Sequence, residues 1–442
     1  MNPGVRVAGI ARFQGWRALQ HRNYRLFFGG QLISLIGTWM QAVAQAWLVL
    51  QLTGDPLLLG VVAAAQFLPV LTLGLFGGLI ADHLPKRRTL IATQIAAMLL
   101  AFALFALTAT GTVQVWHVML LALGLGCVNA VDMPTRQAFA VEMVGRSDIG
   151  NAVALNSAMF NIARIVGPAV AGLTIGALGV GVAFLVNGIS YVAVIVGLFL
   201  MRENDLHAPP RPPRPETVGA VFENLAEGLR YVRQTQLVLL IVVVVGATSL
   251  FGMNFSVLIP PLARELLNTD ASGYGFLMAM NGVGSVVAAL AIAFSGRTGP
   301  RVIGAGALLL GAFEILLAVS RSYPLSLVAM FFMGVGVISL AATANTVIQL
   351  TVPDRLRGRV LSVYTTVFVG STPIGGLLMG FIASRYGVDI SVGIGGAISV
   401  ACGVIALLWL RRVRTRPRPM TAKRELEGAE AAAATLTRIG LR

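Results

Sequence analysis

The sequence predicts an all-α membrane protein with twelve transmembrane helices in two six-helix bundles. Of its 442 residues, 56% are hydrophobic and only 12% are charged, and its mean hydropathy is +0.81. Ordinary soluble domains carry about 25% charged residues, so a chain of this composition lacks the polar surface that water requires. Its apolar residues form long runs rather than the short alternating segments of a membrane β-barrel.

A spanning helix needs about 20 largely apolar residues, and twelve such runs follow one another along the chain. The first half is expected to cross the membrane at 26–50, 57–81, 89–109, 114–134, 150–175 and 180–201. The second half is expected to cross at 237–260, 274–296, 302–320, 325–350, 360–383 and 391–410. An even number of spans places both termini on the same side.

The basic residues indicate which side that is. Placing both termini in the cytoplasm puts all but four of the 33 lysines and arginines on cytoplasmic segments. The exceptions are Arg164, Arg264, Arg321 and Arg385. Because cytoplasmic loops carry such an excess, we interpret the net charge of +15 as a signal of topology, and we expect no nucleic-acid partner.

These features divide the chain into five parts. They are a cytoplasmic N-terminal arm at 1–25, a six-helix bundle at 26–201, a cytoplasmic linker at 202–236, a second bundle at 237–410 and a cytoplasmic tail at 411–442. The linker begins with the proline-rich, extended stretch HAPPRPPRPE. Apolar residues then recur at helical spacing, which is typical of an amphipathic helix on a membrane surface. The tail is expected to be disordered.

The two halves resemble each other. Gly60 and Gly275 end the similar stretches LTGDPLLLG and LNTDASGYG, and Pro168 and Pro373 each lie in a glycine-rich part of the fifth span of their half. Transporters with such repeats hold their substrate near the middle of the membrane, between the halves.

The loop GGLIADHLPKRRTL, at 77–90, resembles the signature between the second and third spans of the major facilitator superfamily. The matching residues are Gly78, Ala81, Asp82, Arg87 and Arg88, whereas 83–86 depart from it. The stretches MPTRQAFAVEMV, NAVALNSAMFNIARIVGPAVAG and VPDRLRGRVLSVYTTVFVGSTPIGG resemble the branch that contains the enterobactin exporter and macrolide and drug exporters. This resemblance implies the major facilitator fold and secondary active export across a bacterial inner membrane, by alternating access and with a proton as the coupling ion.

Six residues are candidates for gating. Asp82 is expected to lie against the positive N-terminal end of the eleventh helix. Lys86 or Arg87 is expected to pair with an acidic residue, Asp132 or Glu142, and the alternative is a solvated basic loop. In the fifth span, GPAVAG resembles the antiporter motif of the superfamily, and its glycine and proline would kink the helix. The candidates are Asp82, Lys86, Arg87, Arg88, Gly167 and Pro168.

Polar residues inside the spans are candidates for substrate binding. One face of the first span carries Gln31, Ser34, Thr38, Gln41 and Gln45, and the tenth span carries Ser339, Thr343 and Thr346. Lipid cannot satisfy such side chains, so each face is expected to line a cavity, with bonding to a neighbouring helix as the alternative. The resemblance points the same way, since the first, fourth, seventh and tenth spans of the superfamily surround the substrate.

Arg164 stands alone in an apolar run, near mid-depth of the fifth span, on one face with Asn161. Exposure to lipid would cost at least ~2.5–3.5 kcal/mol, so its side chain must face protein or a water-filled cavity. We expect both residues to bind an anionic or acceptor-rich part of the substrate. The alternative for Arg164 is a structural role, satisfied by carbonyls and amides of neighbouring spans.

Two carboxylates are candidates for coupling. Asp132 lies at the cytoplasmic end of the fourth span, where a structural bond to the basic loops is the alternative. Glu314 lies near the middle of the ninth span, on a face of small residues that favours close packing. A carboxyl buried there favours its neutral form, so proton binding at Glu314 is one hypothesis, and a structural role is the alternative because the ninth span of the superfamily is usually peripheral. The first span lacks the acidic residue that many proton-coupled drug exporters use, and no feature favours sodium.

Other classes of protein find little support in the sequence. The four histidines lie in loops or at span ends, the two cysteines lie in apolar runs, and neither HExxH nor GxxxxGK[ST] occurs. We therefore expect no intramembrane enzyme, no ATP-driven pump, no metal and no cofactor. The expected protein is a monomer in the lipid bilayer that exports a small amphipathic molecule, drug-like or a siderophore. An importer or facilitator of a small metabolite is the alternative.

Overall fold

A computed structural model describes residues 14–207, 218–296 and 298–415, and the regular structure within these ranges is helical, without strands. Eleven helices are long and apolar enough to cross a membrane. One of them carries two spans, so the described chain makes the twelve crossings that the sequence predicts. Most of the N-terminal arm, the proline-rich stretch and the tail from residue 416 lie outside the described residues, as do the side chains of 74–83.

The N-terminal bundle contains five long helices. They are α1 (Arg22–Thr53), α2 (Pro56–His83), α3 (Lys86–Ala109), α4 (Val115–Leu178) and α5 (Val180–Phe199), after a short 3-10 helix η1 (Gln14–Gln20). The 64-residue helix α4 holds both the fourth and the fifth span. The sequence predicts a loop between them, at 135–149. These residues are helical instead, and two helical segments meet at Gly145, whose non-helical φ of 71° favours glycine.

The C-terminal bundle contains seven helices. They are α7 (Gln236–Phe251), α8 (Phe255–Glu265), α9 (Ala271–Ser295), α10 (Pro300–Val319), α11 (Tyr323–Thr351), α12 (Asp354–Tyr386) and α13 (Val388–Thr415). The seventh span was expected to be one helix, but it is broken at residues 252–254 into α7 and α8. Asn254 occupies the break by donating from its side-chain amide to the carbonyl of Leu250 at 2.8 Å.

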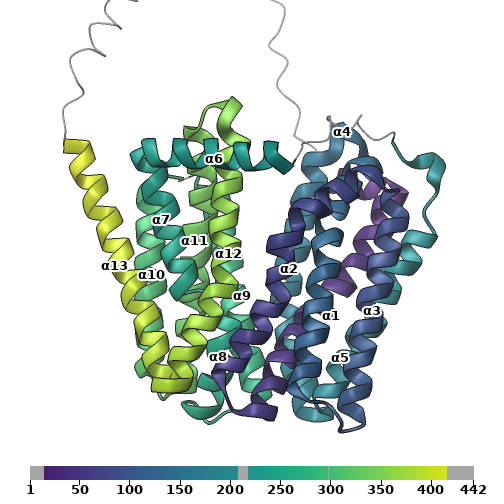
Figure 1. Cartoon of the computed structure of the whole chain (residues 1–442), viewed down its shortest axis with the longest axis horizontal. Helices are drawn as coiled ribbons and strands as arrows, with labels where there is room; N and C mark the ends of the chain where they lie inside the picture. The colour runs from purple at the N-terminus through teal and green to yellow at the C-terminus, as the bar shows by residue number, and fades with distance from the viewer. Residues whose placement is uncertain (1–13, 208–217, 297, 416–442) are drawn as a thin grey trace, which may run out of the picture.

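Helix α6 (Val218–Gln234) lies across the ends of helices of the C-terminal bundle (Figure 1). Its Glu227 forms an ion pair with Arg359 of α12, and its Gly228 packs against the carbonyl of the same arginine. A second 3-10 helix, η2 (Glu203–Asp205), follows α5. Helix α6 therefore marks the end of the molecule at which α12 begins.

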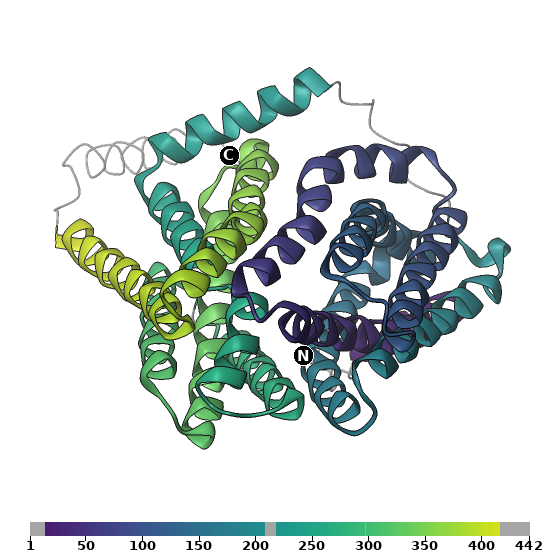
Figure 2. The same cartoon turned by 60° about the horizontal axis from the view of Figure 1, so that its bottom comes forward.

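The two bundles meet at the opposite end of the molecule. There α2 packs on α12 and α4 packs on α9, at residues 56–60 with 376–380 and at 168–172 with 271–275. We call these four segments the closed end, and the end that carries α6 the open end. The bundles lean together at the closed end and diverge toward the open end, as Figures 1 and 2 show.

Candidate transport pathway

The closed end is built from backbone in direct contact with backbone. Gly60 of α2 lies against the carbonyl of Gly376 on α12, and Gly275 of α9 lies against the carbonyl of Pro168 on α4. A Cβ atom at either glycine would overlap the facing carbonyl oxygen, so glycine is what permits the approach. The two glycines are the pair at which the repeated stretches of the sequence end.

Aromatic and polar side chains reinforce this closure. Trp47 of α1 stacks on Tyr274 of α9, with ring centroids 5.9 Å apart and both rings buried. The Ser272 hydroxyl donates to the carbonyl of Gly172 at 3.1 Å, and Arg264 of α8 donates to the carbonyl of Leu50 at 3.3 Å. Each of these contacts joins one bundle to the other.

The motif GPAVAG lies at this interface. Gly167 packs against α1, where an added Cβ would lie 2.5 Å from the Cβ of Trp39 and 2.9 Å from the carbonyl oxygen of Ile36. Pro168 contributes the carbonyl that meets Gly275. The two gating candidates of the fifth span therefore touch a neighbour in their own bundle and a helix of the other bundle.

Arg164 bonds across the interface one turn further from the closed end. Its Nη2 donates to Asn281 Oδ1 of α9 at 2.9 Å, and the amide of Asn281 donates in turn to the carbonyl of Met330 on α11 at 3.4 Å. Gly282 packs against the backbone carbonyl of Arg164. The arginine thus links α4 to two helices of the C-terminal bundle, and Asn161 precedes it by one turn on the same helix.

The predicted polar face of the first span lies largely within the N-terminal bundle. Gln41 Oε1 accepts a hydrogen bond from Asn187 of α5 at 2.6 Å, and Gln45 donates to Gln66 of α2 at 3.2 Å. Thr38 is half-buried and donates to the carbonyl of Ser34. Gln31 is buried and its Oε1 has no partner among the described residues. These bonds match the helix-to-helix alternative for Gln41 and Gln45, and they do not bring this face to Arg164.

The predicted residues of the tenth span differ among themselves. Ser339 and Thr346 are half-buried, whereas Thr343 is fully buried with an Oγ1 that no described residue bonds. Toward the open end, Asn345 accepts a hydrogen bond from the exposed Gln349. Sequence reasoning passed over Asn345, although its spacing of four from Gln349 on one helix face was a usable signal.

The basic loop is held by ion pairs inside the N-terminal bundle. Lys86 Nζ lies 2.8 Å from Glu142 Oε1 of α4, and both side chains are 12% exposed. This is one of the pairs that the sequence predicted. Arg87 instead pairs with Glu203, at 2.5 Å, and donates to backbone carbonyls at the end of α5. Arg88 is exposed, and the side chain of Asp82 lies outside the described residues.

Both coupling candidates are buried. Asp132, 2% exposed, accepts hydrogen bonds from Thr93 at 2.8 Å and Gln94 at 2.9 Å, and it pairs with Arg136 at 2.5 Å. Glu314, 3% exposed, accepts one from Ser399 of α13 at 3.2 Å. The sequence expectation that Glu314 faces a close-packed neighbour is confirmed.

A polar cluster that the sequence did not reveal surrounds the bend at Gly145. His21 Nε2 lies 3.0 Å from Asp148 Oδ2, Arg17 Nε lies 3.3 Å from Oδ1, and the ring of His207 covers Gly145 itself. The hydrogen bond with His21 lowers the pKa of Asp148, partial burial opposes that shift, and the charge of Arg17 adds to it. Because these residues come from three distant parts of the chain, no local pattern could have indicated the cluster.

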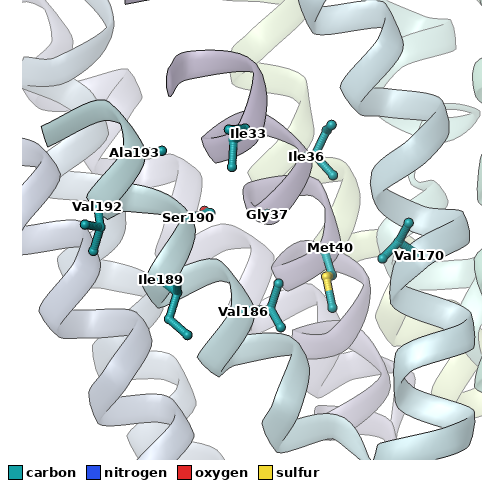
Figure 3. A pocket seen from close by; sticks show the side chains of 10 residues that line it. All are labelled: Ile33, Ile36, Gly37, Met40, Val170, Val186, Ile189, Ser190, Val192 and Ala193. Atoms are coloured by element: carbon teal, nitrogen blue, oxygen red, sulfur yellow. The ribbon is translucent and has the colours of Figure 1, made fainter. Parts of the chain in front are cut away.

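An apolar groove of about 490 Å³ opens between α1, α4 and α5 (Figure 3). Its lining is apolar apart from Ser190, and it includes exposed residues such as Ile33 and Ile189. The groove belongs to the N-terminal bundle alone, because no residue of the C-terminal half lines it. It is therefore separate from the interface at which Arg164 lies.

Comparison with known proteins gives consistent matches over most of the chain. A family model described as a transmembrane secretion effector matches residues 13–440. The chain is 30% identical over 359 residues to the multidrug efflux pump Tap of Mycolicibacterium fortuitum, covering 79% of this chain and 87% of that protein. It is 24% identical over 417 residues to the enterobactin exporter EntS of Escherichia coli O1:K1 / APEC, covering 91% of this chain and 96% of that protein.

The crystal structure of the nucleoside transporter NupG superposes with a TM-score of 0.71 at 12% identity, covering 89% of this chain and 98% of that one. This likeness is one of fold.

Proposed function

The chain belongs to the transmembrane secretion effector family of the major facilitator superfamily, and from that premise we propose that it exports a small amphipathic molecule, drug-like or a siderophore, from the bacterial cytoplasm. Members of this family are multi-pass transporters of the inner membrane rather than enzymes. The observation that carries the proposal is the position of Arg164, bonded across the interface between the two bundles.

Transport follows from rocking of the two bundles about that interface. The closed end consists of close backbone contacts that are either made or broken, so it suits a two-state gate. The positive-inside orientation places the open end, with α6, toward the cytoplasm. The state described here is then open to the cytoplasm, and separation of the closed end releases substrate outside. The ion pairs of Lys86 and Arg87 stiffen the N-terminal bundle, and the loop containing Asp82 and Arg88 closes the inner side in the opposite state.

Arg164 binds the substrate where the bundles meet. A guanidinium carries five N–H donors, and Asn281 takes one of them in the described structure. The remaining donors suit an anionic or acceptor-rich group, and Asn161 supplies an amide one turn away. Ser339, Thr343 and Thr346 are the substrate contacts on the tenth span, and the fully buried Thr343 must first be uncovered. The polar face from Gln31 to Gln45 braces the first span against α5 and α2 of its own bundle.

A proton is the coupling ion. Asp132 and Glu314 are buried carboxylates on spans of the two different bundles, and a carboxylate is a group that can take up and release a proton. Asp132 already has three bonding partners among the described residues, namely Thr93, Gln94 and Arg136. Glu314 has one described hydrogen-bonding partner, Ser399. Antiport of a proton for the substrate then uses the inward proton gradient to drive export.

Flux measurements in proteoliposomes test the proposal. A panel of radiolabelled drug-like compounds and iron-free siderophores is presented to liposomes with an imposed pH gradient, with and without the purified protein. We expect at least one compound to move against its gradient in exchange for protons, and a protonophore to abolish that movement. Movement of substrate in the same direction as the proton would identify an importer, and gradient-independent equilibration would identify a facilitator. Absence of flux for every amphipathic compound would reject the proposal.

A further inference from the structure

Glu314 occupies an enclosed position in the C-terminal bundle. It projects from α10 toward α13, where the Ser399 hydroxyl donates to Glu314 Oε2 at 3.2 Å. Its other oxygen faces the break in the seventh span, since a Cβ added to Gly252 would lie 3.1 Å from Glu314 Oε1 and 2.6 Å from Ser399 Oγ. The carboxyl group therefore touches the point at which α7 ends.

The charges around this carboxyl group are distant. Helix α7 has no ionisable residue, and α11 has one, its first residue Tyr323. Along the chain of α10 itself, Arg301 is thirteen residues before Glu314, and Arg321 is seven residues after it and pairs with Asp389. On α13, Asp389 is ten residues and Arg411 twelve residues from Ser399, which is about 15 and 18 Å along a helix. The thiol of Cys402, three residues from Ser399, is the ionisable group of α13 that lies nearer. No ion pair within the described ranges includes Glu314. An ionised carboxylate without a charged partner is disfavoured in such surroundings, so the neutral acid is the form that fits this state.

The break beside Glu314 has unused hydrogen-bonding capacity. The amide of Gly252 donates to Thr248, but the backbone amides of Met253 and Asn254 make none of the described hydrogen bonds. These two amides lie immediately before Phe255, the first residue of α8, where the positive end of the helix favours a negative charge. An ionised Glu314 would accept from them, whereas a protonated Glu314 can also donate to a carbonyl of the break. The protonation state therefore decides which backbone arrangement the break prefers.

Helix α8 connects the break to the closed end. It is the part of the seventh span that packs against α1 and α2 of the other bundle. Arg264 of α8 donates to the Leu50 carbonyl, and Val257 of α8 packs beside Gly376 and Gly380 of α12, where that helix meets α2. A change in the angle between α7 and α8 would therefore act directly on the contacts that keep the bundles together.

We propose that Glu314 is a proton-binding site that controls the closed end through the break at residues 252–254 and the half-helix α8. The neutral acid keeps α8 in the described position and the closed end shut. Loss of the proton draws the amides of the break and water toward the carboxylate, and α8 swings away from α1 and α2. The inference rests on the proposed proton antiport, in which a bound proton returns the empty transporter to the state that is shut outside.

The test measures the closed end directly. Spin labels are attached at Gln51→Cys and Glu265→Cys, two exposed positions at the ends of α1 and α8, after replacement of Cys127 and Cys402. In the otherwise unaltered protein, we expect the distance between the labels to change from short to long as the pH rises. In Glu314→Gln, which mimics the neutral acid, we expect the short distance at every pH. The matched control Asp389→Asn, an equal change at a half-exposed carboxylate of α13, should titrate as the parent does.

A second variant distinguishes loss of the proton site from misfolding of Glu314→Gln. Ser399→Ala removes the donor that favours the ionised form, so we expect opening to persist with its midpoint shifted to higher pH. Three results would each overturn the inference. They are a label distance that does not change with pH in the parent, a label distance that still changes with pH in Glu314→Gln, and opening driven by Na⁺ at constant pH. If Glu314→Gln locks the distance but no compound is transported by the parent, the switch stands and the proposed export fails. If the parent exports a compound but Glu314→Gln does not change how the closed end opens, the proposed export stands and the switch fails.

Discussion

At the scale of single residues, Arg164 makes the hydrogen bond that the proposed alternating access would rearrange most directly. In the described state Asn281 Oδ1 accepts its hydrogen bond at 2.9 Å, and that bond spans the bundle interface. In the proposed rocking of the bundles, Arg164 and Asn281 would move relative to each other, because they belong to different bundles. A substrate acceptor that replaces Asn281 would keep the guanidinium satisfied during that movement.

We predict that Arg164→Ala abolishes transport while the protein remains inserted and folded. A hydrogen bond within a membrane contributes only about 0.6–1.7 kcal/mol, so its loss does not unfold the chain, whereas loss of the charge removes the substrate's anchor. Transport and substrate binding are measured beside thermal unfolding. Asn281→Ala separates the alternatives, because it removes the same bond and leaves the arginine. If both variants lose transport but keep full substrate binding, Arg164 is structural.

Asp148 gives a prediction about stability and pH. Its pKa is lowered in the folded protein, chiefly by the hydrogen bond with His21, so the bond contributes most when the carboxylate is ionised. That contribution is present above the unfolded pKa of about 3.9 and is lost as the pH falls through the lower folded value. We therefore expect Asp148→Asn to unfold at lower temperature than the parent at pH 7 and at nearly the same temperature in strong acid. The exposed Asp354→Asn is the control, and an equal deficit for Asp148→Asn at every pH would contradict the assignment.

At the scale of helices, the glycines of the closed end set how near the bundles can come. We predict that Gly275→Ala shifts the protein toward the state in which this end is apart, because its Cβ would overlap the Pro168 carbonyl. Overpacking of this kind costs about 1–3 kcal/mol, which corresponds to a roughly 5- to 150-fold change in the ratio of two states. The label pair at residues 51 and 265 measures that ratio.

Gly150→Ala is the matched control for that variant, because nothing lies within 4 Å of its added Cβ. It should leave the distance distribution unchanged. A closed end that stays shut in Gly275→Ala would mean that the backbone contacts do not limit closure.

Sequence predicts helices well here and their interruptions poorly. Lipid makes the length of an apolar run decisive, so the spans, their number and the face of Glu314 followed from local pattern. The bend at Gly145 and the break at 252–254 instead contact groups far along the chain, His207 and Glu314, which no local pattern could place there. Likewise, the polar face of α1 indicated burial, but its partner Asn187 lies 146 residues away. A polar face on one helix indicates that the face is buried, but it does not reveal whether the face lines a cavity or packs on another helix.

At the scale of the whole molecule, orientation and state can be tested together. We predict that a cysteine at Ser157 or Gln349, both exposed toward the open end, reacts with a membrane-impermeant maleimide from the cytoplasmic side. A cysteine at Gln51 should react only from outside. Inverted vesicles and spheroplasts of a background without the native cysteines provide the two directions. Labelling with the sides exchanged would reverse the topology, and labelling of residues 157 and 349 from both sides would show rapid exchange between states.

The backbone-to-backbone character of the closed end has an environmental consequence. Dissolved salt weakens interactions between exposed charges but scarcely affects contacts between glycines and carbonyls. Among the described residues, no ion pair joins the two bundles at that end. A bacterium's surroundings can vary widely in salinity, whereas its cytoplasm is regulated. In the proposed orientation, the face of the transporter turned toward the variable medium is the one shut by these contacts, and we expect the seal to hold equally in dilute water and in brine.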